Sequence, residues 1–336
     1  MSQTTSGTFS GSPSIITLLN ASLRIAQVIG AEETATGAQL ANALDAARAM
    51  CKAWQASGIH VWCEEEAIVF FQPNQTIYQI GAGSSDHVTL WDTLILSSLT
   101  ATALAGATSL TLLTVNGGIS GTRIASGDQI GIQLDSGTNF WTTVSGTPSG
   151  LTVPITTALP SAATQGAIIF DYTTPLYRPL RVYGGRRYNI RSQIDLPLQI
   201  WSRLDYQNQP NKYSTGIPTA LFYDPQTGQS AYSAPVGQWN CWPTPQDNTN
   251  AGRFTAQRPI QDIGSLANIP DFPDEWDAAL KWNLALEIGP ENGCPKEQLD
   301  IIVRQAERWY AMASAWDRES ESIRFGVATQ RGYSRG

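Results

Sequence analysis

Apolar residues near the start of the chain recur every three or four positions, which is the spacing of a helix with one buried face. The first stripe predicts a helix over residues 13–30, with Ser12 as its cap. The second stripe predicts a helix over 36–57, where Thr36 and Gln39 form a capping box. Because the link between them is short, the two helices are expected to form an antiparallel hairpin.

The same spacing returns near the C-terminus. It predicts a helix over 273–288, which Gly289 and Pro290 bring to an end, and a longer helix over 295–321. The longer helix carries an apolar seam made of Leu299, Ile302, Ala306, Trp309, Ala313 and Trp316. A seam of this length suits packing on another helix, so we expect the helices of both chain ends to form one helical body.

Between the two ends the pattern changes to that of strands. Short apolar runs predict strands at 67–72 and 76–80, separated by a Pro-Asn turn signal. The segment 171–262 is rich in Pro and Tyr, and strands are expected there at 198–201 and 220–223. A Pro-Gln-Thr-Gly sequence after the last of these predicts a hairpin turn, because Pro presets φ and Gly accepts a positive φ.

The stretch 97–170 has a composition of its own, dominated by Thr, Ser, Gly, Ala, Ile, Leu and Val. Short strands fit at 108–115, 129–134, 139–144, 151–155 and 167–170. Glycine-containing turn signals lie between them. We therefore predict a small β-barrel or sandwich domain inserted into the chain.

The predicted fold class is α+β. A helical-bundle body is assigned to 13–96 plus 171–322, with a central β-region and the inserted β-domain over 97–170. Residues 1–12 are rich in Ser, Thr and Gly and are expected to form a flexible arm. Residues 323–336 are expected to be a tail that becomes ordered on a partner.

The number and distribution of charged residues limit the kinds of function that the protein can have. The 336 residues include 21 basic and 28 acidic side chains, so the net charge is −7, and only 15% of the residues are charged. Binding to nucleic-acid phosphates requires a clustered basic face, so a general DNA binder is not expected. The segment 97–170 is nearly neutral, because its only charged side chains are Arg123, Asp128 and Asp135.

Cysteine spacing and hydropathy exclude further classes. The cysteines, at Cys51, Cys63, Cys241 and Cys294, do not form a metal-binding or disulfide pattern, which fits a reducing cytoplasm. We expect no metal and no cofactor. The sequence has no apolar run long enough to span a membrane, and its N-terminus lacks the features of an export signal.

The search for catalytic residues yields weak candidates. His60 precedes Cys63 closely, and His87 follows Asp86, but an orienting third group is missing in both places, so we interpret both histidines as loop, strand or turn residues. Residues 64–66 are all Glu, and three consecutive carboxylates cannot share one face of a strand. A glycosidase needs a matched pair of carboxylates, so we interpret this run as a solvated acidic face, an interface charge or a group facing a channel.

Candidate interface residues are basic and aromatic. A cluster after the inserted segment contains Arg178, Arg181, Arg186, Arg187 and Arg191, interleaved with Tyr177, Tyr183 and Tyr188. It could contact RNA or DNA, but we favour a protein interface, because Arg and Tyr are enriched there and the chain is acidic. Further candidates for a subunit or tail interface are Trp239, Trp242, Trp309 and Trp316.

Several short motifs follow one another in a fixed order. They are SLRIA at 22–26, VIGAEE at 28–33, AL at 43–44, Met50, WQASG at 54–58, FQPNQ at 71–75, YQIG at 78–81, RP at 178–179, GIP at 216–218, YDP at 223–225, WPTP at 242–245, DFPDEW at 271–276, AL at 279–280, NLA at 283–285 and GPENG at 289–293. In this order they resemble the head-to-tail adaptor proteins of short-tailed bacteriophages, also called tail accessory factors or packaged-DNA stabilisation proteins. The segment 97–170 has no counterpart in that pattern, and Asn292 stands where an aromatic residue is usual.

The resemblance implies a structural virion protein of the head–tail junction, made in the host cytoplasm, and not an enzyme. Such adaptors form a ring, commonly of twelve copies, beneath the portal protein. The ring extends the channel for double-stranded DNA, which passes without sequence-specific binding, helps to retain the packaged DNA, and docks downstream tail, nozzle or fibre proteins. A weakly charged acidic surface suits such a conduit.

The resemblance also assigns a role to the C-terminal tail. We expect it to bind the portal through Arg324, Phe325, Arg331, Tyr333 and Arg335. The alternative function is a virion-associated, cell-wall-degrading peptidoglycan hydrolase that uses the carboxylates of residues 64–66. A carbohydrate-binding role for 97–170 is a further alternative, with Phe140 and Trp141 as its aromatic residues.

Overall fold

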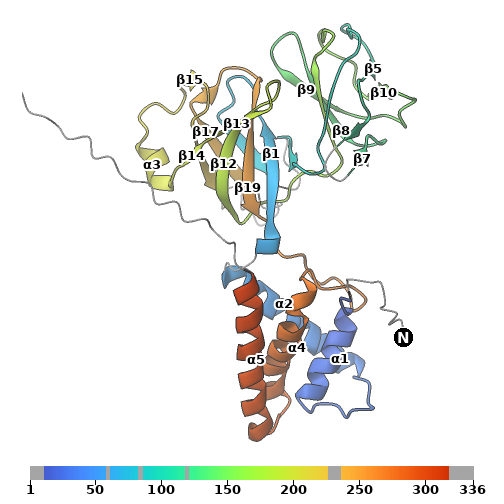
Figure 1. Cartoon of the computed structure of the whole chain (residues 1–336), viewed down its shortest axis with the longest axis vertical. Helices are drawn as coiled ribbons and strands as arrows, with labels where there is room; N and C mark the ends of the chain where they lie inside the picture. The colour runs from blue at the N-terminus through green and yellow to red at the C-terminus, as the bar shows by residue number, and fades with distance from the viewer. Residues whose placement is uncertain (1–10, 58–60, 82–85, 118–120, 226–235, 318–336) are drawn as a thin grey trace, which may run out of the picture. The chain divides into compact units, whose positions relative to one another are not determined.

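The computed structural model describes residues 11–57, 61–81, 86–117, 121–225 and 236–317, and it has a mixed α+β architecture (Figure 1). The chain divides into two compact units. Residues 1–62 and 260–336 form a helical unit, and residues 63–259 form a β unit. The predicted class is confirmed in this respect, because helices from both chain ends pack together and antiparallel sheets lie between them in sequence.

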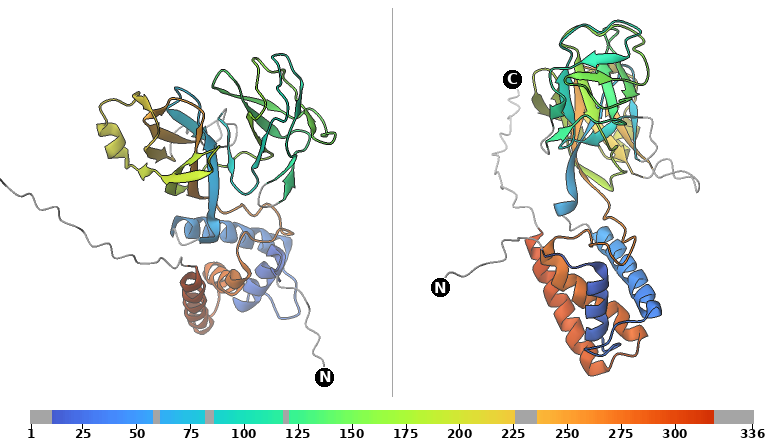
Figure 2. Two further views of the ribbon diagram at one scale, coloured as in Figure 1. Left: turned by 45° about the horizontal axis from the view of Figure 1, so that its top comes forward. Right: turned by 90° about the vertical axis from the view of Figure 1, so that its right-hand side faces the viewer.

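The helical unit joins helices from the two ends of the chain, blue and orange to red in Figure 2. Its elements are α1 Ile15–Ile25, α2 Gly37–Ser57, the 3-10 turn η2 Asp274–Trp276, α4 Asp277–Glu291 and α5 Lys296–Trp316. Helix α4 contacts α1, α2 and α5, so it forms the centre of the unit. It buries Leu280, Leu284 and Ile288 there.

The helix starts follow local hydrogen bonding. The predicted capping box is confirmed, because the backbone N–H of Gln39 donates to Thr36 Oγ1 (3.3 Å) and that of Thr36 donates to Gln39 Oε1 (2.9 Å). The predicted cap of α1 is wrong. Ser14 precedes the helix without a side-chain cap bond, and the hydroxyl of Ser12 donates instead to the side chain of Asp274.

The predicted end of α4 is also wrong, because the helix continues through Pro290 to Glu291. Proline has no backbone N–H and therefore removes one hydrogen bond of the helix. The loss is tolerated here because only one helical residue follows Pro290. Asn292 then donates its backbone N–H to Gly289, and Gly293 adopts a φ of 72°, which stops the helix.

The apolar seam of α5 packs as expected on another helix, and that helix is α4 of the same chain. Ile302, Ala306 and Ala313 are buried along the seam, whereas Trp309 is only half-buried. The seam is therefore used within the subunit, as the expected helical body requires.

The β unit contains two sheets that face each other across one core. The first has the order β13-β12-β19-β1-β3, with bounds Ile194–Pro197, Arg181–Asn189, Asn250–Gln257, Glu64–Phe70 and Val88–Leu90. The second has the order β14-β16-β17-β2, with bounds Gln199–Ile200, Ala220–Asp224, Gly237–Trp242 and Ile77–Ile80. Val69 and Phe254 of the first sheet share a buried cluster with Leu221 and Trp239 of the second. Successive side chains of a strand point to opposite faces of its sheet, so each sheet directs one set of apolar side chains into this common core.

The β unit and its first connection to the helical unit also contain short elements outside the two sheets. They are η1 Val61–Cys63, α3 Arg203–Asn208, β15 Thr215–Gly216 and β18 Thr244–Pro245, of which β15 and β18 pair in parallel. Helix α3 begins with a capping box between Ser202 and Asp205. The peptide bond between Trp242 and Pro243 is cis.

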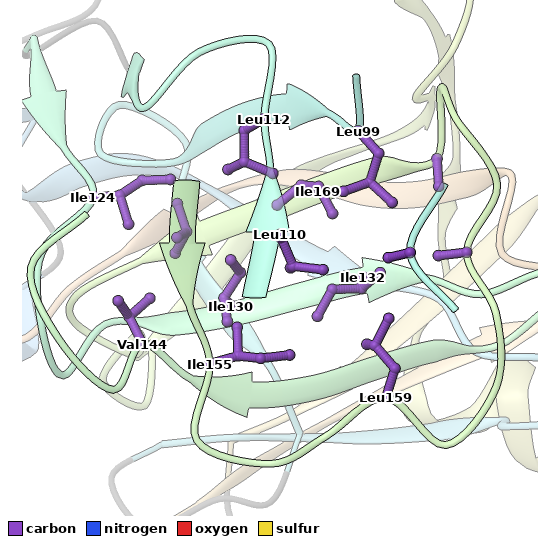
Figure 3. Close-up of a cluster of buried hydrophobic side chains, with 14 of the residues drawn as sticks. Leu99, Leu110, Leu112, Ile124, Ile130, Ile132, Val144, Ile155, Leu159 and Ile169 are labelled. Atoms are coloured by element: carbon purple, nitrogen blue, oxygen red, sulfur yellow. The ribbon is translucent and has the colours of Figure 1, made fainter. Parts of the chain in front are cut away.

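The inserted segment has a hydrophobic core of its own (Figure 3). Its strands are β4 Ile95–Ser98, β5 Ser109–Thr111, β6 Asn116–Gly117, β7 Thr122–Arg123, β8 Gln129–Gln133, β9 Asn139–Thr143, β10 Thr152–Pro154 and β11 Ile168–Tyr172. The described strands form an open sheet, β4-β11-β8-β9, and two strand pairs, and these pairings do not close into a barrel. Ile95 pairs with Asp171, so the segment begins and ends side by side.

A second apolar cluster joins this segment to the outer face of the first sheet. Phe70 of β1 lies 4.5 Å from Phe170 and 5.1 Å from Trp141, measured between ring centroids. Gly131 leaves room for the indole, because a Cβ at that position would lie only 2.7 Å from Trp141. His87 also stacks on Trp141, because the two rings lie 3.8 Å apart and are nearly parallel.

Candidate functional site

The three consecutive glutamates lie at the start of β1, and their side chains alternate between the two faces of the strand. Glu66 accepts hydrogen bonds from the guanidinium groups of Arg186 and Arg253. On the opposite face, Glu65 pairs with Nε of Arg258 at 2.9 Å. The interpretation as a solvated acidic face is therefore wrong, because these carboxylates are half-buried and paired with arginines.

Arg253 connects Glu66 to a second acid. Its Nη1 lies 3.0 Å from Oδ2 of Asp195, and its guanidinium carbon lies 4.2 Å from the ring centre of Trp91. Glu66, Arg186, Arg253 and Asp195 thus form an ion-pair network on four strands of the first sheet, β1, β12, β19 and β13. Two positive and two negative charges balance, so the network presents no net charge to a ligand.

The protonation state of Glu66 bears on the hydrolase alternative. Burial raises the pKa of this carboxyl, but the hydrogen bonds from Arg253 and Arg186 outweigh burial and hold the pKa below its usual value. A general acid in glycoside hydrolysis needs a raised pKa. Glu66 is held in the opposite state, so this network gives the hydrolase alternative no support.

The basic and aromatic cluster is largely tied to its own chain. Arg178 donates to the carbonyl of Pro225 at 2.7 Å, and Arg187 donates to that of Pro218 at 3.4 Å. Arg181 and Tyr183 are exposed on β12 and stay interface candidates. Tyr188 is only 4% exposed and packs in the cluster around Phe70, which corrects its assignment to an interface.

Two of the four tryptophan candidates can be placed at or near the surface. Trp242 is half-buried, its ring is tilted by 31° against that of Trp201 with the centroids 5.3 Å apart, and its indole N–H donates to the carbonyl of Asn211. Trp309 is half-buried on α5. Trp239 is fully buried in the core between the two sheets, so its assignment as an interface anchor is wrong. The side chain of Trp316 lies outside the described structure.

An exposed apolar region near β13 was missed by the sequence reasoning. Large apolar side chains are exposed at Ile194, Leu196, Ile200, Leu204, Tyr213 and Ile217, and we call this set the apolar edge. It includes β13 and β14, the edge strands of the two facing sheets, and α3 (Figure 1). Edge strands that carry apolar side chains are suited to contacts with other chains. The alternating sequence of 194–200 is that of an ordinary half-buried strand, so it could not reveal this exposure.

Reactive and metal-binding groups are sparse in the part of the chain that the structure describes. No group of three or more His, Cys, Asp or Glu side chains that could hold a metal ion occurs there. Burial raises the pKa of Cys51 to about 11 and that of Cys241 to about 12, so both thiols stay protonated. Burial also lowers the pKa of His87 to about 4. Its Nδ1 lies 2.8 Å from the hydroxyl of Tyr172, so this residue joins a packed aromatic cluster.

Other predicted residues lie outside the described ranges. These are His60 and the tail residues Arg324, Phe325, Arg331, Tyr333 and Arg335. None of the described helices is long and apolar enough to cross a membrane.

No protein-family model and no curated protein matches this chain.

Proposed function

We propose that the chain is a structural virion protein: a head-to-tail adaptor that forms a ring beneath a portal, extends the DNA channel, retains packaged DNA and docks tail components. The observation that supports this most directly is the helical unit built from both chain ends, with the β unit connected to it at residues 62 and 260. The sequence pattern also predicts a discontinuous body, but with the bounds 13–96 plus 171–322, whereas the structure divides the chain at residues 62 and 260.

The apolar edge supports the proposed assembly into a ring. A closed ring of identical subunits requires two different surfaces on each subunit, which contact each other head to tail. The apolar edge supplies one of them, because its side chains are exposed on edge strands that can be covered by another copy. Arg181 and Tyr183 on β12 remain candidates for the complementary surface.

The segment 97–170 is proposed to be a sandwich-like insertion that contacts tail components. Its support is the separate core of Figure 3, in which Ile130 and Ile132 of β8 lie near Leu110 of β5. Val153 of β10 belongs to the same buried cluster. A segment with its own core can be added to an adaptor without rebuilding the body.

Size-exclusion chromatography with the portal of the encoding phage tests the proposal. We expect the wild-type chain to co-elute with the portal as a ring-sized complex, and Leu204→Lys to reduce this assembly, because it places a charge on the apolar edge. Leu204 is 64% exposed, and Leu104, 69% exposed in the inserted segment, offers a matched control in Leu104→Lys. A wild-type chain that never co-elutes with the portal contradicts the proposal.

A further inference from the structure

One histidine joins the inserted segment to the first sheet. His87 directly precedes β3, an edge strand of that sheet, and its ring stacks on Trp141 of β9. The ring centroids lie 3.8 Å apart and the ring planes differ by 8°. Nδ1 of His87 lies 2.8 Å from the hydroxyl oxygen of Tyr172, which is the last residue of β11. Both partners belong to the inserted segment, so this imidazole forms part of a contact between two regions of the β unit.

The surroundings of this contact are apolar. Trp141 also meets Phe70 of β1 and Phe170 of β11, with ring centroids 5.1 and 6.1 Å from its own. Both phenylalanines are buried, and His87 itself is half-buried. Such a contact accommodates a neutral imidazole, but it leaves a charged one with little water around it.

The segment that carries His87 supplies one acid, Asp86, and that acid is engaged elsewhere. Its carboxylate accepts a hydrogen bond from Nε2 of Gln75 and another from the backbone N–H of Gln79, both at 2.7 Å. Burial is the cause that lowers the pKa of His87 to about 4, because it penalises the charged imidazolium.

The strands packed against His87 do not compensate a charge on it either. β3 and β9 contain no charged residue, and the glutamates of β1 lie at the opposite end of that strand from Phe70. On β11, Asp171 precedes Tyr172, but successive side chains point to opposite faces of a strand. Asp171 lies instead beside Ile95 of the inserted core. Burial raises the pKa of Tyr172, so its hydroxyl stays neutral.

We propose that the stack of His87 on Trp141 makes the attachment of the inserted segment to the first sheet sensitive to acid. Histidine changes its charge more readily near neutral pH than other side chains, and a charged imidazole favours water over this apolar contact. Protonation therefore releases His87 from Trp141 and loosens the packing around Phe70. The core of the inserted segment contains no histidine and stays folded. This proposal does not depend on ring formation, because every residue it uses lies within the β unit.

The direction of the pH dependence follows from the two states of the imidazole. Released into solvent, it has the ordinary pKa of about 6.5, whereas in the stack it has a pKa of about 4. The released state therefore binds the proton more tightly. The attachment has its full strength above about pH 6.5 and weakens as the pH falls towards 4.

Hydrogen–deuterium exchange of the full-length protein, measured by mass spectrometry at pH 7.5 and pH 5.0, tests the proposal. After correction for the intrinsic exchange rate at each pH, we expect the exchange of β3 and β9 to be about tenfold to thirtyfold faster at pH 5.0. The upper figure is the ratio that the two pKa values give, and the lower one allows for the half-buried position of the ring. Helix α4 of the helical unit is the internal reference and should not change.

Two variants separate the charge of His87 from its packing. His87→Phe keeps an aromatic ring on Trp141, and His87→Gln keeps a group that can hydrogen-bond to Tyr172, but neither side chain ionises. The corrected exchange of β3 and β9 should be equal at the two pH values in both variants. Other groups such as Glu66 titrate alike in all three proteins, so the difference belongs to His87. Equal corrected exchange of the wild type at both pH values, or the same acid-induced rise in the variants, would overturn the proposal.

Discussion

At the residue scale, Glu66 holds three strands together. Its own strand is β1, and its two arginine partners come from β12 and β19, with β19 lying between the other two. Arg253 is 18% exposed, so its charge depends on these carboxylates for compensation. The network therefore acts on the stability of the first sheet, whatever the protein binds.

Glu66→Gln tests that role. The change keeps the shape and removes the charge, so we expect a loss of about 1–3 kcal/mol in the free energy of unfolding at pH 7, measured with urea. Because the folded pKa of Glu66 is lowered, its contribution is present above the unfolded pKa and disappears as the pH falls through the folded one. The exposed Glu32→Gln is the control. Equal stability of both variants at pH 7 would refute the role.

Asp171 is the least compensated acid of the inserted segment. It is 1% exposed, and its Oδ1 has no hydrogen-bond partner among the residues that the structure describes. Asp171 pairs with Ile130 of β8, so Asp128, two residues earlier, lies on the same face and is also buried. Burial first, and the charge of Asp128 second, raise the pKa of Asp171 to about 8.

This pKa fixes a direction for the pH dependence of stability. The folded state holds the proton of Asp171 more tightly than the unfolded state, so stability falls as the pH rises from about 4 to about 8. Asparagine resembles the protonated acid in shape and cannot ionise, so Asp171→Asn should remove this dependence of stability on pH. Thermal unfolding should therefore show the variant to be more stable than wild type at pH 9 and similar to it at pH 4. Asp300→Asn on the exposed side of α5 is the control, and an unchanged slope in Asp171→Asn would contradict the assignment.

At the scale of helices and strands, features set by residues close in sequence could be predicted, whereas contacts between residues far apart in sequence could not. The capping box of Thr36 and Gln39 and the seam of α5 depend on residues three or four apart, so the sequence contains them. Trp239 was misassigned because prolines follow it closely, whereas β17 pairs with strands on both sides and buries it. The partners of Glu66 are 120 and 187 residues away, and strand register alone brings them together.

The inserted segment offers a prediction at this scale. A fragment of residues 94–173 should fold alone with a cooperative thermal transition, because its core is internal and its first and last strands pair. Deleting 97–170 from the full chain has a different consequence. It exposes Ile68 and Phe70, which pack against that segment, so the remaining β unit should melt at a lower temperature.

Circular dichroism and dispersed amide signals in NMR spectra test the fragment. A non-cooperative transition for residues 94–173 would show that this segment needs the first sheet in order to fold. An unchanged melting temperature after the deletion would show that the cluster around Phe70 contributes nothing to stability.

At the scale of the whole molecule, the charge composition is compatible with the proposed role as a DNA conduit. The net charge of −7 and the charged fraction of 15% leave little to retard passing DNA. The described arginines that looked available for DNA are largely paired with acids or carbonyl groups. We therefore expect that the proposed ring would surround DNA without binding it tightly.

Removal of residues 323–336 tests the role assigned to the C-terminal tail. The helical unit should keep its far-ultraviolet circular dichroism, because α1, α2, α4 and α5 are all retained in the truncated chain. Docking to the portal should be lost, which co-sedimentation with portal particles would measure. Leu204→Lys, which acts on the apolar edge instead, is the comparison. Normal docking of the truncated chain would contradict the tail assignment.

The central claim is that the chain assembles as a ring on a portal. Electron cryomicroscopy of the purified chain mixed with the portal of the encoding phage measures this directly. The account predicts class averages with a closed ring of copies beneath the portal, coaxial with its channel. Portal particles that carry no added ring, beside free chains that remain monomeric, would contradict it.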